Sequence, residues 1–124
     1  RHMSKHITYT SLSKPSKHIV GSGNAGHINC TYQHLVNMFG EPMLPTDGYK
    51  TSAEWHIEVH HDNMLKGVVA IYDYKQSKSY SRDGLDTEDI TEWNLGAKSN
   101  RLAADLLYFI KEPRSQEQAV THVQ

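Results

Sequence analysis

The sequence contains one cysteine, Cys30, so the chain cannot form an intrachain disulfide. Disulfide frameworks are typical of small secreted proteins, and their exclusion makes a reducing cytoplasm the expected compartment. We expect Cys30 to be a small, half-buried residue, with a reactive thiol as the alternative. The chain also lacks an apolar stretch of the roughly 18 residues that a membrane span needs, and its first residues lack the apolar run of a signal peptide. These absences predict a soluble protein that does not bind membranes.

The sequence also has no excess of charge of either sign, since 13 basic residues face 14 acidic ones and the net charge is -1. Proteins that bind DNA or RNA depend on a basic surface that displaces counterions from the phosphates. A protein that mimics DNA needs the opposite, a dense field of carboxylates. The composition therefore argues against nucleic acid as a partner and against a nucleic-acid mimic.

Motifs of catalysis are missing as well. The sequence contains no nucleophile elbow, no H-E-x-x-H metal motif and no P-loop. We therefore predict a protein that is not an enzyme, with no cofactor and no catalytic residue.

A chain of 124 residues is long enough for one domain with a buried core. We assign 4–113 to a single α+β domain and 114–124 to a C-terminal arm or short helix, because Pro113 ends the last helical pattern. The first three residues, Arg1-His2-Met3, are interpreted as a cloning remnant.

Hydrophobic periodicity predicts the elements of this domain. Alternating residues indicate an edge strand at 7–12, a short extended segment at 17–20, a hairpin over 51–75 that turns within 62–67, and a strand at 90–95. Helical spacing indicates a helix over 28–39, capped by Asn29 or Thr31 and ended by Gly40, and a second helix from Ser99 or Asn100 that stops at Pro113. We expect an antiparallel sheet of four to five strands with two helices packed on one face.

The string GSGNAG at 21–26 matches G-x-G-x-x-G, which in dinucleotide-binding folds holds a pyrophosphate at the start of a helix. Its surroundings fit that fold poorly, because the helix caps come after the motif and a hairpin follows the helix in place of a second parallel strand. Two interpretations stay open. The glycines allow a tight crossing between strand and helix, or the backbone N–H groups of Gly21, Ser22, Gly23 and Gly26 form a nest that binds an anion.

The segment IYDYKQSKSYSRDG at 71–84 places aromatic rings and cations close together. Tyr72 and Tyr74 are predicted on the same side of a strand, and a ligand with a base and phosphates could stack on the rings and pair with the cations. The alternative is that these tyrosines pack under the last helix. The start of that helix offers another anion site. The candidate ligand-binding residues from these patterns are Tyr72, Tyr74, Lys75, Tyr80, Arg82, Asn100 and Arg101.

The string EWHIEVHH at 54–61 places imidazoles and carboxylates on one side of a strand. Such a set could hold a divalent metal, and His56 and His60 are the outside candidates for it. Alternating charges on the exposed face of a hairpin also serve cross-strand pairing and solubility, and no clear third ligand occurs elsewhere. We therefore predict no metal site.

Four strings occur in a fixed order between about residues 20 and 108: GSGNAGHINCTYQHLVNMFGEP, DGYKTSAEWHIEV, GVVAIYDYK and DITEWNLG. Together they resemble a family of short bacteriophage and prophage proteins, the anti-Thoeris sponges, which sequester a cyclic ADP-ribose signal of bacterial immunity without cleaving it. The resemblance implies a small αβ protein that forms homo-oligomers and binds this small cyclic nucleotide near subunit boundaries, in the cytoplasm of an infected bacterium. It carries over Lys50, Tyr72, Tyr74 and Lys75 as ligand-binding residues. The chain departs from the family pattern at Gly96-Ala97, where a Gly-Gly pair is usual.

Two other functions stay open on the sequence. The first is inhibition of a host defence protein or a CRISPR effector, through a protein–protein interface formed by the hairpin 54–75 and the C-terminal arm. The second is a metal-dependent nuclease or phosphodiesterase that uses His56, His60 and neighbouring carboxylates.

Overall fold

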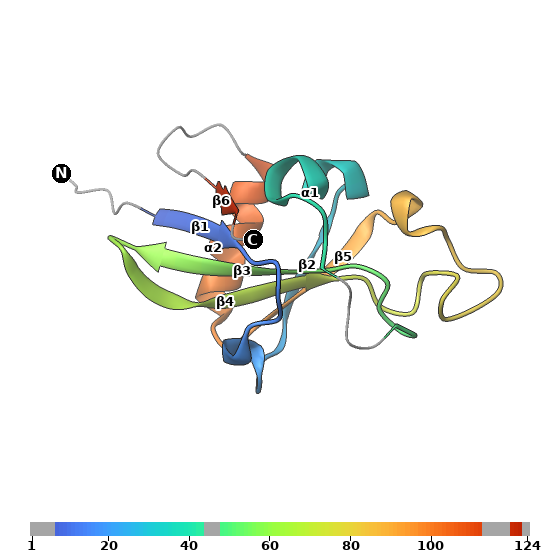
Figure 1. Ribbon diagram of the computed structural model, residues 1–124, viewed down its shortest axis with the longest axis horizontal. Helices are drawn as coiled ribbons and strands as arrows, with labels where there is room; N and C mark the ends of the chain where they lie inside the picture. Colours follow the sequence, from blue (N-terminus) through green and yellow to red (C-terminus); the bar gives the residue numbers. More distant parts are fainter. Residues whose placement is uncertain (1–6, 44–47, 113–119, 123–124) are drawn as a thin grey trace.

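A six-stranded sheet forms the centre of the protein in the computed structural model, which describes residues 7–43, 48–112 and 120–122 (Figure 1). The strands are β1 (Ile7–Ser11), β2 (Gly23–Asn29), β3 (Glu54–His61), β4 (Met64–Tyr72), β5 (Glu92–Ala97) and β6 (Val120–His122). Their order is β2-β5-β4-β3-β1-β6, and all neighbours are antiparallel except β1 and β6, which run parallel. The described helices are α1 (Tyr32–Phe39), α2 (Asn100–Lys111) and the short 3-10 helices η1 (Lys17–Ile19) and η2 (Thr87–Asp89). The predicted α+β class is confirmed.

One hydrophobic core joins the sheet to both α-helices. Alternation along β3 buries Trp55 and Ile57 on one face of the sheet, which we call the core face. The buried side chains of the helices, among them Phe39 of α1 and Leu106 of α2, belong to the same core. Trp55 meets Trp93 of β5 edge to face, with ring centroids 5.5 Å apart, which is a favourable geometry for aromatic pairs.

Both helices begin at a side-chain cap. The Thr31 hydroxyl accepts a hydrogen bond from the His34 backbone N–H at 3.0 Å, and Ser99 caps α2 through the Leu102 N–H at 3.2 Å. Gly40 follows α1 with φ 85°, a conformation that favours glycine, so the predicted helix end is confirmed. In the described part of the chain, no helix is long and apolar enough to cross a membrane.

The hairpin of β3 and β4 is also confirmed, and its turn lies within the predicted range. Asp62 and Asn63 connect the strands with φ angles of 52° and 72°. Two successive positive φ angles are typical of a type I′ turn, whose twist matches that of a β-hairpin, and short polar residues tolerate them.

The two ends of the described chain differ from the prediction. The segment predicted as extended at 17–20 is the 3-10 helix η1, because the Ser16 hydroxyl accepts from the His18 N–H and starts a helical turn. β1 is not an edge strand, because β6 pairs with it on its outer side. β6 lies in the region predicted as an arm or short helix, and its hydrogen-bond partner is too distant in sequence for a local pattern to reveal. The cloning remnant, residues 113–119 and residues 123–124 lie outside the described residues.

The glycine-rich segment is mainly a strand and not a loop. Residues from Gly23 onward form β2, which pairs with β5, and the register shifts between Asn24 and Gly26 as in a β-bulge. Ile28 is therefore buried from a strand and not from the helix that its spacing suggested. Ile28 fits both the two-residue period of a strand and the 3.6-residue period of a helix. The spacing alone therefore could not place the end of the strand.

The other face of the sheet, which carries Glu54 and His56 and which we call the second face, is only partly exposed. The η1 segment lies on this side, opposite α1, as Figure 1 shows with η1 below and α1 above the sheet. His56 is 2% exposed, and Val68 and Ala70 are each 4% exposed. The second face therefore has a small covered region of its own, and the two cavities described below open beside it.

Candidate functional site

A cleft of about 250 Å³ opens on the second face, where the glycine-rich segment meets the sheet, and we call it the glycine cleft. The glycine-rich segment lines it with Ser22, Gly23 and Asn24, and the sheet lines it with Glu54, Tyr72 and Gly96. Strand register brings these residues together, because Asn24 pairs with Gly96, Gly96 with Ala70, and Tyr72 with Glu54. The segment and the tyrosine that the sequence singled out separately thus share one cleft.

The Tyr72 ring packs against β5 at Gly96, which has no side chain. A Cβ built on Gly96 would lie 3.3 Å from Tyr72 Cε1, so the ring rests on the Gly96 backbone. Burial raises the pKa of the Tyr72 hydroxyl, and the Glu54 charge and Tyr74 add to the shift. The phenol is therefore protonated at neutral pH and can donate a hydrogen bond to a ligand in the cleft.

A buried histidine orients the acidic side chain of the cleft. His56 Nδ1 accepts a hydrogen bond from the Ser16 N–H at 3.0 Å, so the ring proton of the neutral imidazole is on Nε2. Nε2 lies 2.6 Å from Glu54 Oε2 and donates to it. The Glu54 side chain is 25% exposed, and its orientation is fixed by this bond. The sequence indicated Glu54 and His56 only as metal ligands, because the Ser16 contact depends on the tertiary structure.

Asp73 ties the cleft to the rest of the fold, and the sequence did not single it out. Its carboxylate is fully buried and accepts from the Ser52 N–H at 2.8 Å, the Ser52 hydroxyl at 2.8 Å and the Ala53 N–H at 2.9 Å. These bonds hold the chain before β3 against the end of β4, next to Tyr72. A carboxylate directly after a buried strand is a local signal that could have drawn attention to it.

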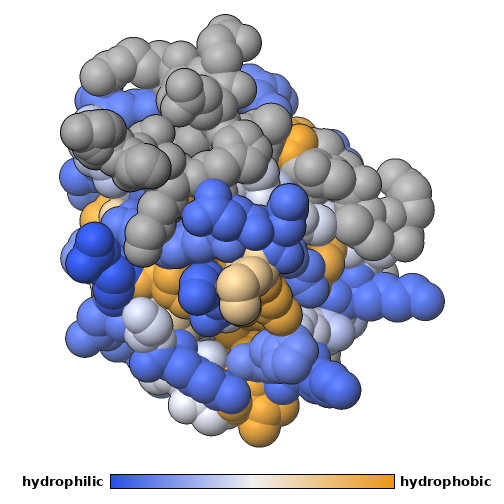
Figure 2. Space-filling model, turned by 90° about the vertical axis from the view of Figure 1, so that its left-hand side faces the viewer, coloured by the Kyte–Doolittle hydropathy of each residue, from blue (hydrophilic) through white to orange (hydrophobic). Residues whose placement is uncertain are grey.

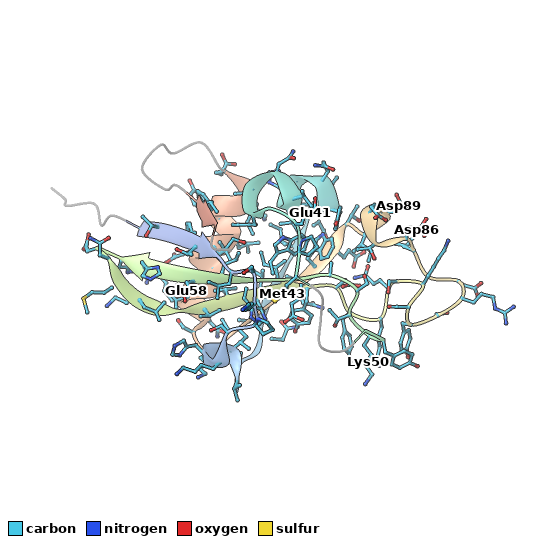
Figure 3. The ribbon with its side chains drawn as sticks, in the orientation of Figure 1. Glu41, Met43, Lys50, Glu58, Asp86 and Asp89 are labelled. Carbon is cyan, nitrogen blue, oxygen red and sulfur yellow. The ribbon has the colours of Figure 1, made fainter. Side chains whose placement is uncertain are left out.

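Three other candidate residues, Tyr74, Lys75 and Tyr80, gather with Tyr49 in a group of rings that we call the tyrosine cluster. Lys75 Nζ lies 5.1 Å from the ring centroid of Tyr74 and 5.6 Å from that of Tyr80, within the range of cation–π attraction. The Tyr49 and Tyr80 centroids are 5.0 Å apart. The Lys75 N–H donates to the Lys50 carbonyl at 2.7 Å, and Figure 3 places Lys50 in this loop region.

Tyr72 and Tyr74 line different cavities, although Asn94, the strand partner of Tyr72, lines the cavity of Tyr74. β4 ends at Tyr72, and the chain then turns around the buried Asp73. Tyr74 is 44% exposed and lines a separate cavity of about 250 Å³ together with His27 and Asn94. No single cavity therefore takes both rings, because β4 ends at Tyr72 and the chain turns before Tyr74.

The remaining candidates lie elsewhere, so the predicted set does not form one site. Arg82 is exposed in the loop between β4 and η2. Asn100 and Arg101 are exposed in the first turn of α2, and Arg101 Nε lies 3.5 Å from Asp105 Oδ1. The common feature of these residues in the sequence is their charge or polarity, which does not determine which loops meet.

Two of the four backbone N–H groups predicted to form an anion-binding nest in the glycine-rich segment already donate hydrogen bonds. The Ser22 N–H donates to the Ile19 carbonyl at 3.0 Å, and the Gly26 N–H donates to Asn24 Oδ1 at 3.0 Å. These two groups are occupied within the segment. Its contribution to the cleft is therefore its shape and the Asn24 side chain, because the Ser22 hydroxyl oxygen is buried.

The outside metal candidates lie on the second face but do not come together. Both ring nitrogens of His56 are engaged, and His60 Nε2 lies 3.7 Å from Glu58 Oε1. Figure 3 shows Glu58 on β3, away from Asp86 and Asp89 at the opposite end of the molecule. Within residues 7–43, 48–112 and 120–122, no three His, Cys, Asp or Glu side chains are grouped so that they could hold a metal ion.

Comparisons with known proteins add no relative. The sequence matches none of the protein-family models, and a search of curated proteins finds no match. The resemblance to the sponge family therefore stays a prediction, and the glycine cleft is the observation on which a function can be based.

Proposed function

We propose that this protein is a non-enzymatic binder that sequesters a small cyclic nucleotide of the cyclic ADP-ribose type, as a bacteriophage counter-defence protein in an infected bacterium. One observation carries the proposal: the glycine-rich segment and Tyr72, indicated independently by the sequence, line the same cleft. The four ordered strings that resemble the anti-Thoeris sponges support the class of ligand.

The lining of the glycine cleft suits the nucleoside half of such a ligand. A carboxylate such as Glu54 accepts hydrogen bonds from ribose hydroxyls, as acidic residues of dinucleotide-binding folds do. The Tyr72 ring offers a face on which a base can stack, and its protonated hydroxyl is a donor. The Glu54 charge disfavours a phosphate beside it, so we expect the phosphates outside the cleft.

The size of the cleft supports the homo-oligomer that the resemblance implies. Sites for whole small molecules measure roughly 300–1,000 Å³. The glycine cleft, at about 250 Å³, is large enough for part of a cyclic nucleotide. In the proposed function, a second subunit covers the rest of the ligand.

Sequestration requires tight binding and no turnover. Competition with an immune sensor calls for a nanomolar Kd, which corresponds to about 12 kcal/mol of binding free energy. Fixed groups such as Glu54, held by His56, favour affinity because they lose little freedom on binding.

Isothermal titration calorimetry with cyclic ADP-ribose and its isomers tests the proposal. We expect a Kd in the nanomolar range, and mass spectrometry of the heat-released ligand should show it intact. Tyr72→Ala should weaken binding about tenfold or more, because stacking of a base on an aromatic ring is worth about 1–3 kcal/mol. Tyr108→Ala, at a tyrosine of α2 that is 63% exposed, is the matched control. Absence of binding, or recovery of a cleaved ligand, would contradict the proposal.

The tyrosine cluster favours a second candidate function, inhibition of a host defence protein or CRISPR effector. Tyr49 is 53% exposed and Tyr74 is 44% exposed, and exposed tyrosines are enriched where proteins meet. The double variant Tyr49→Ala/Tyr74→Ala should then lose a purified effector in a pull-down and keep its affinity for the cyclic nucleotide. If the double variant and the wild type retain the effector equally, this surface is not the interface.

A further inference from the structure

A second cavity lies next to η1 and has a different chemistry from the glycine cleft. It measures about 320 Å³ and is lined by residues of η1, the start of β4 and the start of α2, and we call it the basic cavity. No residue lines both this cavity and the glycine cleft. The two cavities can therefore be altered separately.

The charged groups that line the basic cavity are all cationic or can become so: His18, Lys66 and Lys98. Its lining holds no carboxylate, and neither lysine forms an ion pair with the described acidic residues. The chain as a whole carries a net charge of -1, so two unneutralised lysines at one cavity are not a consequence of composition. Lysine ammonium groups are common binders of phosphate, and the start of α2 beside them adds a partial positive charge.

The floor of the basic cavity is apolar. Val68 is 4% exposed and Leu102 is 8% exposed, while Leu65 is 42% exposed at the margin. Gly67 lies between these residues, and a Cβ at this position would come within 2.7 Å of Leu102 Cδ1. Figure 2 views the molecule from the end where the β3–β4 hairpin turns, and hydrophobic patches lie among hydrophilic residues on this side. A ligand seated here would contact cations at the rim and hydrocarbon below.

We propose that the basic cavity binds a small organic phosphate, with the phosphate held by Lys66 and Lys98 and the organic group on Val68 and Leu102. The volume of about 320 Å³ lies in the range of small-molecule sites. The site does not depend on the function proposed for the glycine cleft.

Phenyl phosphate is a suitable probe, because it combines a doubly charged phosphate with an apolar ring. In an NMR titration we expect shifts of the Gly67 and Ser99 amide signals, both at the cavity. Inorganic phosphate, which lacks the ring, and benzyl alcohol, which lacks the charge, should each bind about tenfold more weakly, or 1.4 kcal/mol. Equal affinity of inorganic phosphate and phenyl phosphate would overturn the assignment of the floor to an organic group.

The charge requirement is tested with two double variants that remove the same charge. Lys66→Gln/Lys98→Gln should weaken phenyl phosphate binding about tenfold or more. The control Lys14→Gln/Lys111→Gln changes exposed lysines elsewhere and should leave the affinity within about twofold. Similar losses in both variants, or no shift at Gly67 and Ser99 in the wild type, would overturn the proposal. Tyr72→Ala should keep phenyl phosphate binding, so that failure at one cavity is distinguishable from failure at the other.

Discussion

The two faces of the sheet are built from the same strands and differ in almost every other respect. The core face buries Trp55, Ile57 and Trp93 in one core with side chains of α1 and α2. The second face carries the Glu54–His56 pair, and the glycine cleft and basic cavity open beside η1. Because side chains alternate along a strand, β3 contributes to both faces with neighbouring residues.

This difference indicates that stability and ligand binding are largely separate in this protein. The free energy gained from apolar burial lies on the core face, where side chains are close-packed. The second face includes polar side chains that are partly exposed, such as Glu54 and Tyr72, and substitutions of these leave smaller holes and fewer unpaired groups. Substitutions on the core face should therefore mainly lower the free energy of unfolding. Substitutions on the second face should mainly weaken ligand binding.

The largest expected effect is that of Trp93→Ala on the core face. Loss of a fully buried tryptophan and of its hydrogen bond to the Cys30 carbonyl should lower the free energy of unfolding by about 3–5 kcal/mol. Tyr72→Phe is the comparison on the second face, where we expect about 0.5 kcal/mol or less. Urea denaturation of both variants measures the difference, and equal losses would contradict the separation of the two faces.

Asp73→Asn should have the next largest effect, because the Asp73 carboxylate holds the chain before β3 against the end of β4. The amide keeps one acceptor oxygen and loses the charge that three donors share, so we expect a loss of about 2 kcal/mol. Ligand affinity of the glycine cleft should fall as well, since the chain before β3 is no longer held. Asp83→Asn, at an exposed aspartate of the same loop region, is the control and should unfold like the wild type.

Alkaline pH should weaken the fold through ionisable groups of the core. Burial raises the pKa of Cys30 from 9.0 to about 11, and burial with the nearby Asp105 raises the pKa of Tyr9 from 10.0 to about 12. Both groups favour their neutral form in the folded state, so stability is fully present below pH 9 and is lost progressively as pH rises towards 12.

Denaturation at several pH values measures this loss of stability. Cys30→Ala should remove the part of the loss that begins near pH 9, because this part comes from the thiol. The same shift predicts slow modification of the Cys30 thiol by maleimide at pH 7, since the thiolate is the reactive form. Rapid labelling of the folded protein at neutral pH would show that the thiol is not protected.

Gly96→Ala should have a small effect on stability and a clear effect on binding. The added Cβ would press on the Tyr72 ring at 3.3 Å, which a small movement of the ring relieves. We expect the free energy of unfolding to change by about 1 kcal/mol or less, because alanine also reduces the freedom of the unfolded chain. Affinity for the cyclic nucleotide should fall several-fold, as calorimetry would show. Unchanged affinity would mean that Tyr72 does not contact the ligand.

Much of the core face was predictable from the sequence. The alternation around Trp55, the polar turn at Asp62 and Asn63, and the caps at Thr31 and Ser99 are local signals, and each was confirmed. The candidate site was predictable only in part. The sequence indicated Tyr72 and the glycine-rich segment, but it joined Tyr72 to Tyr74, which faces a different cavity.

The sequence by itself determined the elements whose causes lie within a few residues of one another: the two helices, the end of α1 at Gly40 and the hairpin. Only the tertiary structure decided that β6 covers β1, that Ser16 orients His56, and that the glycine-rich segment faces Tyr72. These contacts join residues far apart in the chain, and they form because each strand and each buried polar group needs hydrogen-bond partners. Local patterns show that a partner is needed, and folding alone selects which residue supplies it.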